Sequence, residues 1–116
     1  MRICVDLDGT ICKLKRENQD YSEVEAIQGV SEALKKLKND GSYILIYTAR
    51  RMRTHDGNLQ KVICDIGQAT VDWLEKNEVV YDELIFGKPY ADVYIDDLAV
   101  TFEGDWNKLC KKLTQS

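Results

Sequence analysis

The sequence predicts an α/β fold with a largely parallel sheet. Short apolar runs rich in β-branched residues alternate along the chain with segments whose apolar residues recur every three to four positions. Strands that alternate with helices in this way are typical of parallel sheets. The run Tyr-Ile-Leu-Ile-Tyr at residues 43–47 is nearly all apolar, as expected for a strand that is covered on both faces.

The expected elements follow the chain in a simple order. Strands are predicted at residues 3–7, 43–47, 84–86 and 93–95, with a short edge strand at 100–102, and helices at 29–39, 59–74 and 105–113. Gly41 provides the left-handed residue that ends the first helix. Residues 11–27 show no clean pattern, so we expect a turn followed by a small hairpin or loop. Right-handed crossovers should place helices on both faces, giving a Rossmann-like three-layer sandwich.

Length and composition limit the class of protein. A chain of 116 residues supports one domain, residues 1–116, and its net charge of −4 disfavours binding to nucleic acid or to an anionic membrane surface. No apolar run approaches the roughly 20 residues that span a bilayer, and the chain enters a strand at once without a signal-peptide pattern. We therefore expect a cytoplasmic protein.

The cysteines and the histidine argue against two kinds of site. Cys4, Cys12, Cys64 and Cys110 are scattered without a Cys-x-x-Cys pair, which argues against a zinc site and a redox dithiol. Cys4 and Cys64 fall on apolar positions, so we expect both to be buried and reduced. His55 is the one histidine of the sequence, which rules out a multi-histidine metal site.

Two carboxylates close the first strand. Side chains alternate along a strand, so Asp6 and Asp8 should project the same way, about 6–7 Å apart. Like charges at that range cost roughly 2–3 kcal/mol at an effective dielectric constant near 20. A divalent cation removes that cost, and Mg²⁺ prefers such oxygen ligands. The alternative is an ordinary acidic turn after a strand.

Polar groups follow the other strands as well. Together with Asp6 and Asp8, the strand-end residues are Thr48, Lys88, Asp96 and Asp97. The carboxyl ends of parallel strands share one rim, where ligands of open α/β sheets bind. Four carboxylates, a hydroxyl and an ammonium suit Mg²⁺-dependent phosphoryl transfer, in which a carboxylate can serve as nucleophile. Taken one at a time, Thr48 could be a strand-end cap, Lys88 a surface lysine before Pro89, and the Asp96–Asp97 pair an acidic turn. With the acidic turn already named for the first strand, these alternatives would require four coincidences.

At these residues the chain resembles the haloacid dehalogenase-like (HAD) phosphohydrolases. Residues 6–10 (Asp-Leu-Asp-Gly-Thr) match the first motif of that superfamily, and Thr48 after residues 44–47 resembles the second. Lys88 in Gly-Lys-Pro resembles the third motif, and residues 95–97 (Ile-Asp-Asp) the fourth. The motifs occur in the same order and at similar spacing over nearly the whole chain.

The resemblance implies a role for each motif residue. Asp6 would attack phosphorus, and Asp8 would protonate the leaving alcohol and then activate water. Thr48 would hydrogen-bond a phosphate oxygen, and Lys88 would hold the phosphate and steady Asp6. Mg²⁺ would be bound by the Asp6 side chain, the Asp8 carbonyl and one or both of Asp96 and Asp97.

Further candidate residues adjoin these motifs. Candidates for substrate binding are Gly9, Thr10, Ala49, Arg50, Arg51, Arg53 and His55. The basic loop after Thr48 could bind a second phosphate, a carboxylate or a sugar acid, with Arg50 the first choice. The alternative is a solvated basic loop.

The short connections leave no room for a cap domain like those of many HAD proteins. An open site implies a large substrate or a neighbouring subunit of a homo-oligomer over the rim. The Thr-Ala-Arg-Arg-Met-Arg segment at residues 48–53, with Gly-Lys-Pro and Tyr-Ile-Asp-Asp downstream, resembles small phosphatase-like proteins of bacterial surface polysaccharide synthesis. This resemblance suggests a phosphorylated sugar or sugar acid as substrate.

The expected function is therefore that of a Mg²⁺-dependent phosphomonoesterase acting through an aspartyl-phosphate on a small phosphorylated substrate. One alternative is a nucleotidase or polynucleotide phosphatase with the same chemistry. The other is a non-catalytic, receiver-like module in which an aspartate is phosphorylated as a signal.

Overall fold

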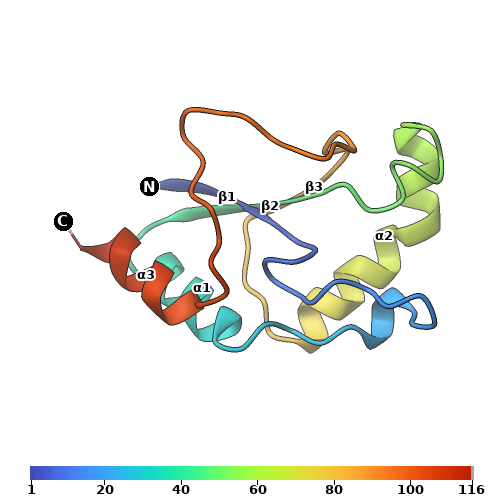
Figure 1. Ribbon diagram of the computed structural model, residues 1–116. Coiled ribbons are helices and arrows are strands. Elements are labelled where there is room, and N and C mark those ends of the chain that lie inside the picture. Colours follow the sequence, from blue (N-terminus) through green and yellow to red (C-terminus); the bar gives the residue numbers. More distant parts are fainter. Residues whose placement is uncertain (116) are drawn as a thin grey trace.

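The structure is a computed structural model and describes residues 1–115. These residues form three parallel strands and three α-helices, joined by loops and one 3-10 turn. The elements are β1 (Arg2–Asp6), the 3-10 turn η1 (Tyr21–Glu23), α1 (Val30–Asn39), β2 (Tyr43–Thr48), α2 (Leu59–Lys76), β3 (Glu83–Phe86) and α3 (Trp106–Thr114). The sheet has the order β1-β2-β3, and both neighbouring pairs are parallel (Figure 1). The predicted α/β class with a parallel sheet is confirmed.

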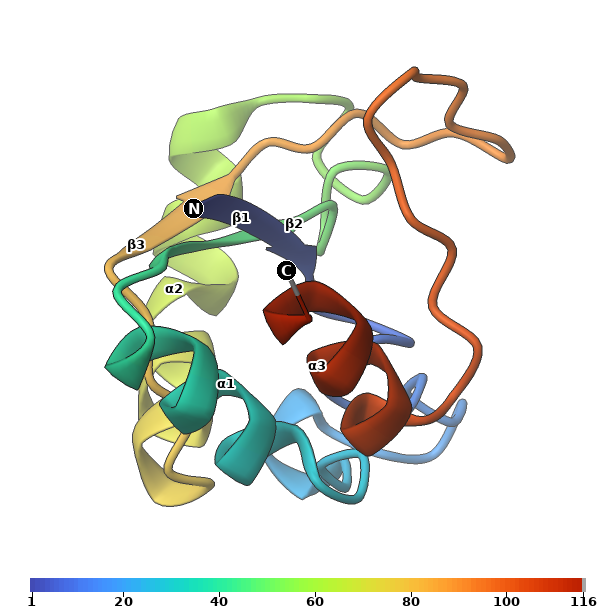
Figure 2. The same ribbon diagram turned by 90° about the vertical axis from the view of Figure 1, so that its left-hand side faces the viewer.

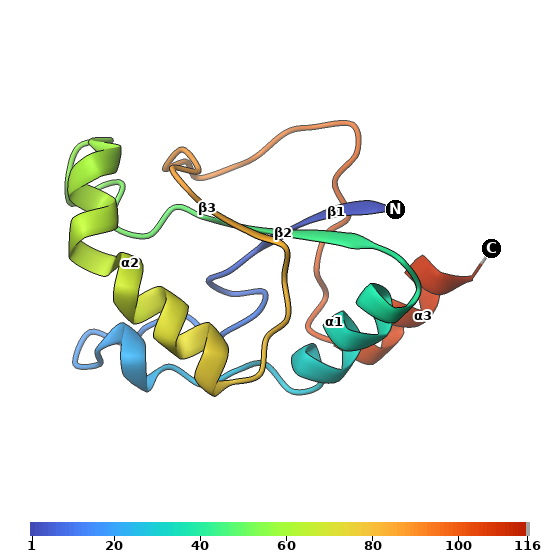
Figure 3. The ribbon, with the colours of Figure 1, turned by 180° about the vertical axis from the view of Figure 1, so that it is seen from behind.

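All three α-helices lie on one side of this sheet, whereas helices were expected on both faces. Figures 1 and 3 show α1, α3 and the later turns of α2 below the strands, the first turns of α2 beyond the strand ends, and the segment after β3 arching above the sheet. The strand order explains the difference. The connections β1-α1-β2 and β2-α2-β3 each lead to the next strand in the same direction across the sheet. Because such connections share one handedness, α1 and α2 lie on the same face.

The core fills the space between the sheet and the helices. Val5 and Leu7 alternate with outward-facing residues, and on β2 both Ile46, the register partner of Val5, and Ile44 are fully buried. Each such side chain contributes roughly 1.5–3 kcal/mol when it is removed from water. Figure 2 shows α1 and α3 side by side beneath the sheet, and Trp106 of α3 belongs to the same core.

The expectation that Cys4 and Cys64 are buried is wrong. Cys4 lies between two core-facing positions of β1, so strand alternation turns it to the opposite, exposed face. Cys64 lies on the outer side of α2, between the buried Val62 and Ile66. The buried thiols are those of Cys12 and Cys110.

The strands expected at 93–95 and 100–102 are not formed in the structure. Residues 89–101 are all exposed, with Ile95 94% and Leu98 86% accessible. The carboxylate of Asp96 accepts hydrogen bonds from the backbone N–H groups of Leu98 (2.6 Å) and Ala99 (3.1 Å). This local turn competes with a β-ladder for the same backbone. Within residues 1–115, β1 pairs with β2 alone, so its outer edge is open.

Residues 11–27 form a loop closed like a small hairpin, as expected. Cys12 and Ala26 form an antiparallel bridge, with η1 between them. Two tryptophans hold the loop to the helices. The indole N–H of Trp73 donates to the Val24 carbonyl at 2.8 Å, and that of Trp106 donates to the Thr10 carbonyl at 2.7 Å.

Among residues 1–115, no helix combines the length and the apolar character that crossing a bilayer requires.

Candidate active site

The carboxyl ends of the three strands meet at one rim, toward the start of α2 in Figure 1. Asp6 closes β1, Thr48 closes β2, and Lys88 follows β3. The backbone N–H of Lys88 donates to the Thr48 carbonyl at 3.0 Å, which ties the third strand end to the second. Four of the predicted residues, Asp6, Asp8, Thr48 and Lys88, are thus brought together by the parallel sheet.

Asp8 is held by a buried arginine. The Arg50 Nε lies 3.0 Å from Asp8 Oδ1 and 3.1 Å from Oδ2, and the Arg50 side chain has no exposed surface. The remaining guanidinium nitrogens donate to Thr70 Oγ1 at 3.1 Å and to Cys12 Sγ at 3.5 Å. The Tyr21 ring packs against the same guanidinium, 4.1 Å from its central carbon. Arg50 therefore fixes Asp8 rather than facing the solvent as a free substrate-binding group.

Thr48 contributes to the same arrangement. Its hydroxyl donates to Asp8 Oδ2 at 3.2 Å and accepts the backbone N–H of Arg50 at 3.1 Å. The residue is completely buried. In this conformation Thr48 orients the carboxylate, and its hydroxyl does not face solvent.

Asp6 is held less tightly. Its Oδ1 lies 3.2 Å from Lys88 Nζ, and 35% of the Asp6 side chain is exposed. Burial raises the pKa of Asp6 above its usual 3.8; the Lys88 ammonium opposes this shift, and the Asp8 charge adds to it. The Lys88 ammonium also lies over the Tyr94 ring, 4.1 Å from its centre. Asp6 is thus an accessible carboxylate with a single cation beside it.

Asp96 and Asp97 do not join this group. Asp96 binds its own turn, as described above, and both side chains belong to the exposed segment. No group of three or more His, Cys, Asp or Glu side chains within residues 1–115 could hold a metal ion. The Asp6 and Asp8 carboxylates are moreover engaged by Lys88 and Arg50. This arrangement of residues does not fit a bound Mg²⁺.

The basic loop after Thr48 divides into two parts. Ala49, Arg51 and Arg53 line a cleft of about 460 Å³ beside Asp8. His55 is not among the lining residues, and its Nε2 pairs with Asp65 Oδ2 at 2.8 Å. The first half of the loop faces the cleft, and His55 closes the loop onto α2.

The glycine and threonine of the first motif shape the turn after β1. Gly9 has a φ of 90°, which favours glycine, and its N–H donates to the Cys12 carbonyl at 2.7 Å. The Thr10 carbonyl accepts the Trp106 indole. Both residues set the backbone course that presents Asp8.

Sequence reasoning missed several residues of this site. Cys12, Tyr21 and Thr70 contact Arg50, and Lys15 lines the cleft. No sequence pattern marks the three residues that belong to the irregular loop 11–27, and Thr70 resembles a core position of α2. The one available signal was a threonine among the apolar residues of a helix face.

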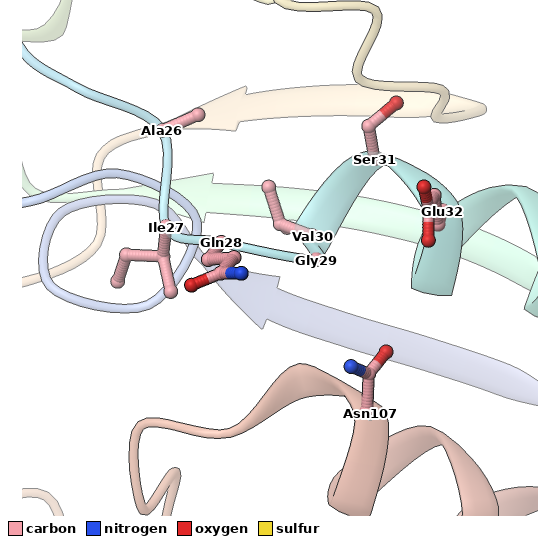
Figure 4. A pocket seen from close by; sticks show the side chains of 8 residues that line it. All are labelled: Ala26, Ile27, Gln28, Gly29, Val30, Ser31, Glu32 and Asn107. Carbon is pink, nitrogen blue, oxygen red and sulfur yellow. The ribbon is translucent and has the colours of Figure 1, made fainter.

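A second pocket lies elsewhere, at the start of α1. Figure 4 shows it between the residues leading into α1 and Asn107 of α3. Of its lining residues, Glu32 is the one with an ionisable side chain. This pocket shares no lining residue with the cleft beside Asp8.

Comparisons with known proteins bear on the fold. No family model matches the chain, and no curated protein matches it. Among solved structures, the crystal structure of an MCSG target from Vibrio cholerae matches with a TM-score of 0.79 and 34% sequence identity. The match covers 97% of this chain and 98% of that chain. The two proteins belong to one family. The likeness to the Vibrio cholerae protein concerns the fold, so the chemistry is inferred from the rim residues themselves.

Proposed function

We propose that the protein is a phosphomonoesterase that forms an aspartyl-phosphate on Asp6, with a sugar phosphate or a similar small metabolite as substrate. The observation that carries this proposal is the meeting of three strand ends at one rim. There an exposed carboxylate, Asp6, lies 3.2 Å from Lys88, and a second carboxylate, Asp8, is fixed by Thr48 and Arg50. A nucleophile, an acid/base group and a phosphate-binding cation are the parts that this chemistry needs.

The steps balance in atoms and protons. An Asp6 carboxylate oxygen attacks phosphorus, the bond from phosphorus to the ester oxygen breaks, and Asp8, which has taken up a proton before this step, gives that proton to the leaving alcohol. Asp8 then takes a proton from water, which attacks the phosphorus of the acyl phosphate. Phosphate leaves, and Asp6 and protonated Asp8 are restored. Lys88 carries positive charge beside Asp6 throughout, where the phosphate oxygens would lie.

Membership of the HAD superfamily, the three-layer sandwich and Mg²⁺ dependence belong to the same proposal. Binding of Mg²⁺ by Asp96 or Asp97 requires residues 93–97 to pair as a strand with the open edge of β1, which would carry both carboxylates to the rim. The length of the exposed apolar segment and the unpaired edge of β1 support this rearrangement.

A homo-oligomer over an uncapped rim, and a role in polysaccharide synthesis, also remain proposals. The exposed apolar side chains after β3 support the first, because contiguous apolar surface is typical of interfaces. These residues are Tyr90, Val93, Tyr94, Ile95, Leu98 and Val100.

The test is phosphate release from a panel of phosphate esters, with and without Mg²⁺, by the wild-type protein and by Asp6→Asn and Asp8→Asn. We expect both variants to lose turnover by about a thousandfold or more, as is typical when a group that acts directly on the reacting atoms is removed. Asp72→Asn, an exposed carboxylate on α2, is the matched control and should keep full turnover.

Two outcomes would contradict the proposal. Turnover that survives Asp6→Asn would exclude Asp6 as nucleophile. Slow self-phosphorylation without release of phosphate would favour the receiver-like module instead.

A further inference from the structure

The cleft beside Asp8 carries more positive charge than Asp8 can balance. Four cationic side chains line it, Lys15, Arg50, Arg51 and Arg53, against the single carboxylate of Asp8. Because Arg50 is committed to Asp8, three cations remain in a chain whose net charge is −4. A cleft lined by one sign of charge attracts ligands of the opposite sign.

These cations have few partners in the protein. Among residues 1–115, neither Lys15 nor Arg53 pairs with a carboxylate; the Lys15 ammonium donates to the Arg16 carbonyl, and Arg53 contacts Tyr90. Arg51 Nε is buried without a hydrogen bond. It lies 3.5 Å from Asp65 Oδ2, and that oxygen is already bound by His55. A separation of 3.5 Å is too long for a strong charge-assisted hydrogen bond, so Arg51 Nε keeps its capacity to donate one.

The cations also lie on one particular side of the reacting groups. Asp8 lines the cleft, whereas Asp6 and Lys88 do not. In the proposed reaction Asp6 receives the phosphoryl group and Asp8 protonates the leaving alcohol. The cleft is therefore on the leaving-group side, and its cations are not needed to hold the transferred phosphate.

Size and walls agree with this placement. The cleft volume of about 460 Å³ lies within the range of small-molecule sites, and Tyr21 and Tyr90 are among its lining residues. Lys15 Nζ and the central guanidinium carbon of Arg51 lie 5.8 and 5.2 Å from the centre of the Tyr21 ring. Both cations therefore lie beside this lining residue of the cleft.

We infer that the cleft binds a second anionic group on the leaving alcohol, so that the substrates are phosphate monoesters that also carry a carboxylate or a second phosphoryl group. Lys15, Arg51 and Arg53 provide the positive charge for that group. The inference rests on the proposed phosphomonoesterase function, because the leaving-group side is defined by Asp8.

Matched substrates test it. The pairs are 3-phosphoglycerate with glycerol 3-phosphate, 6-phosphogluconate with glucose 6-phosphate, and fructose 1,6-bisphosphate with fructose 6-phosphate. We expect the member with the second anionic group to have a kcat/KM at least about tenfold higher, as one good charge-assisted hydrogen bond provides. The first two pairs report on a carboxylate and the third on a phosphoryl group. A preference below about twofold in every pair would overturn the inference.

The variants are Lys15→Gln and Arg53→Gln, with Arg16→Gln as the matched control. Arg16 is an exposed cation of the same loop that does not line the cleft. We expect the first two variants to lower the kcat/KM of the member with the second anionic group far more than that of the member without it, so that most of the preference is lost. Arg16→Gln should keep the preference. Equal losses on both members of a pair would contradict a specific anion site.

Binding separates this inference from the proposed function. If no ester is turned over, the phosphatase proposal fails, but the cleft can still be tested by titrating 3-phosphoglycerate and glycerol 3-phosphate into the protein by calorimetry. The anion site is supported if 3-phosphoglycerate binds more tightly than glycerol 3-phosphate and if Lys15→Gln weakens that binding. Equal affinities for the two ligands overturn it.

Discussion

The two carboxylates that follow one another at the end of β1 are held in contrasting ways. Asp8 meets a fully buried arginine through both oxygens and a buried hydroxyl besides, and 22% of its side chain is exposed. Asp6 meets one lysine, itself 19% exposed, and 35% of the Asp6 side chain is exposed. Two residues apart, one carboxylate is fixed in position and the other is open to a reactant. The following changes test this contrast.

The largest effect is expected from Arg50→Gln. Removing one partner of a buried ion pair leaves the other uncompensated and costs about 3–5 kcal/mol. Urea unfolding followed by fluorescence measures the loss of stability. Arg16→Gln, an exposed cation, should stay within about 0.5 kcal/mol of the wild type. A loss below about 1 kcal/mol for Arg50→Gln would mean that the buried pair does not support the fold.

A smaller loss is expected from Thr70→Val. The Thr70 hydroxyl accepts from Arg50 at 3.1 Å and donates to the Ile66 carbonyl at 2.8 Å, and its removal strands a buried donor at a cost of about 1–3 kcal/mol. Thr114 makes a similar backbone contact, to the Cys110 carbonyl, but touches no cation. Thr114→Val should therefore cost clearly less. Equal losses would show that Arg50 does not depend on Thr70.

Asp6→Asn should raise thermal stability slightly at neutral pH. Because burial raises the pKa of folded Asp6 above 3.8, the folded state binds more protons between 3.8 and that pKa, and stability falls as pH rises through this window. The loss of stability that comes from burying the charged Asp6 carboxylate is complete above the folded pKa and absent below 3.8. Melting temperatures in metal-free buffer from pH 3 to 8 should show the gain of Asp6→Asn shrinking as pH falls.

Glu25→Gln is the control of opposite sign. A hydrogen bond from Lys13 and its charge lower the pKa of Glu25 below 4.5, so its contribution to stability is present above 4.5 and lost as pH falls through the folded pKa. This variant should lower the melting temperature slightly at pH 7. A lower melting temperature for Asp6→Asn as well would show that the ion pair with Lys88 stabilises the fold by more than the burial of the Asp6 charge destabilises it.

The smallest perturbation is thiol labelling. It compares Cys4, on the exposed face of β1, with Cys12, which is buried beside Asp8. At pH 8 the native protein should take up label at Cys4 and Cys64, more slowly at Cys4, because burial raises its pKa. Burial and the Asp8 charge raise the pKa of Cys12 to about 12, so it should remain unlabelled until the chain unfolds. Mass spectrometry counts the labels, and early labelling of Cys12 would mean that the Arg50 cluster opens readily.

The sequence predicted what depends on local pattern. Three of the predicted strands, the three helices, the left-handed Gly41 after α1 and the meeting of Asp6, Thr48 and Lys88 follow from local sequence pattern and from one topological rule. The placing of Arg50 does not, because an arginine after a strand carries no sign of whether its guanidinium turns inward. That choice depends on Tyr21 and Thr70, which are distant in sequence.

The segment after Lys88 marks the other limit. Val-Tyr-Ile at residues 93–95 has the composition of a strand, yet these residues are exposed, and Asp96 binds a local turn. Strand formation depends on a partner edge as much as on propensity. For residues 93–95 that pairing is a tertiary contact that no local pattern specifies.

The two indole hydrogen bonds that anchor the loop after β1 have an evolutionary consequence. They hold the Thr10 and Val24 carbonyls, so the exposed and half-buried residues 13–20 between these anchors can change in number or kind while the helices keep their places. Lys15, which lines the cleft, lies in that interval. Selection can therefore alter which molecules the rim accepts without having to rebuild the scaffold beneath it.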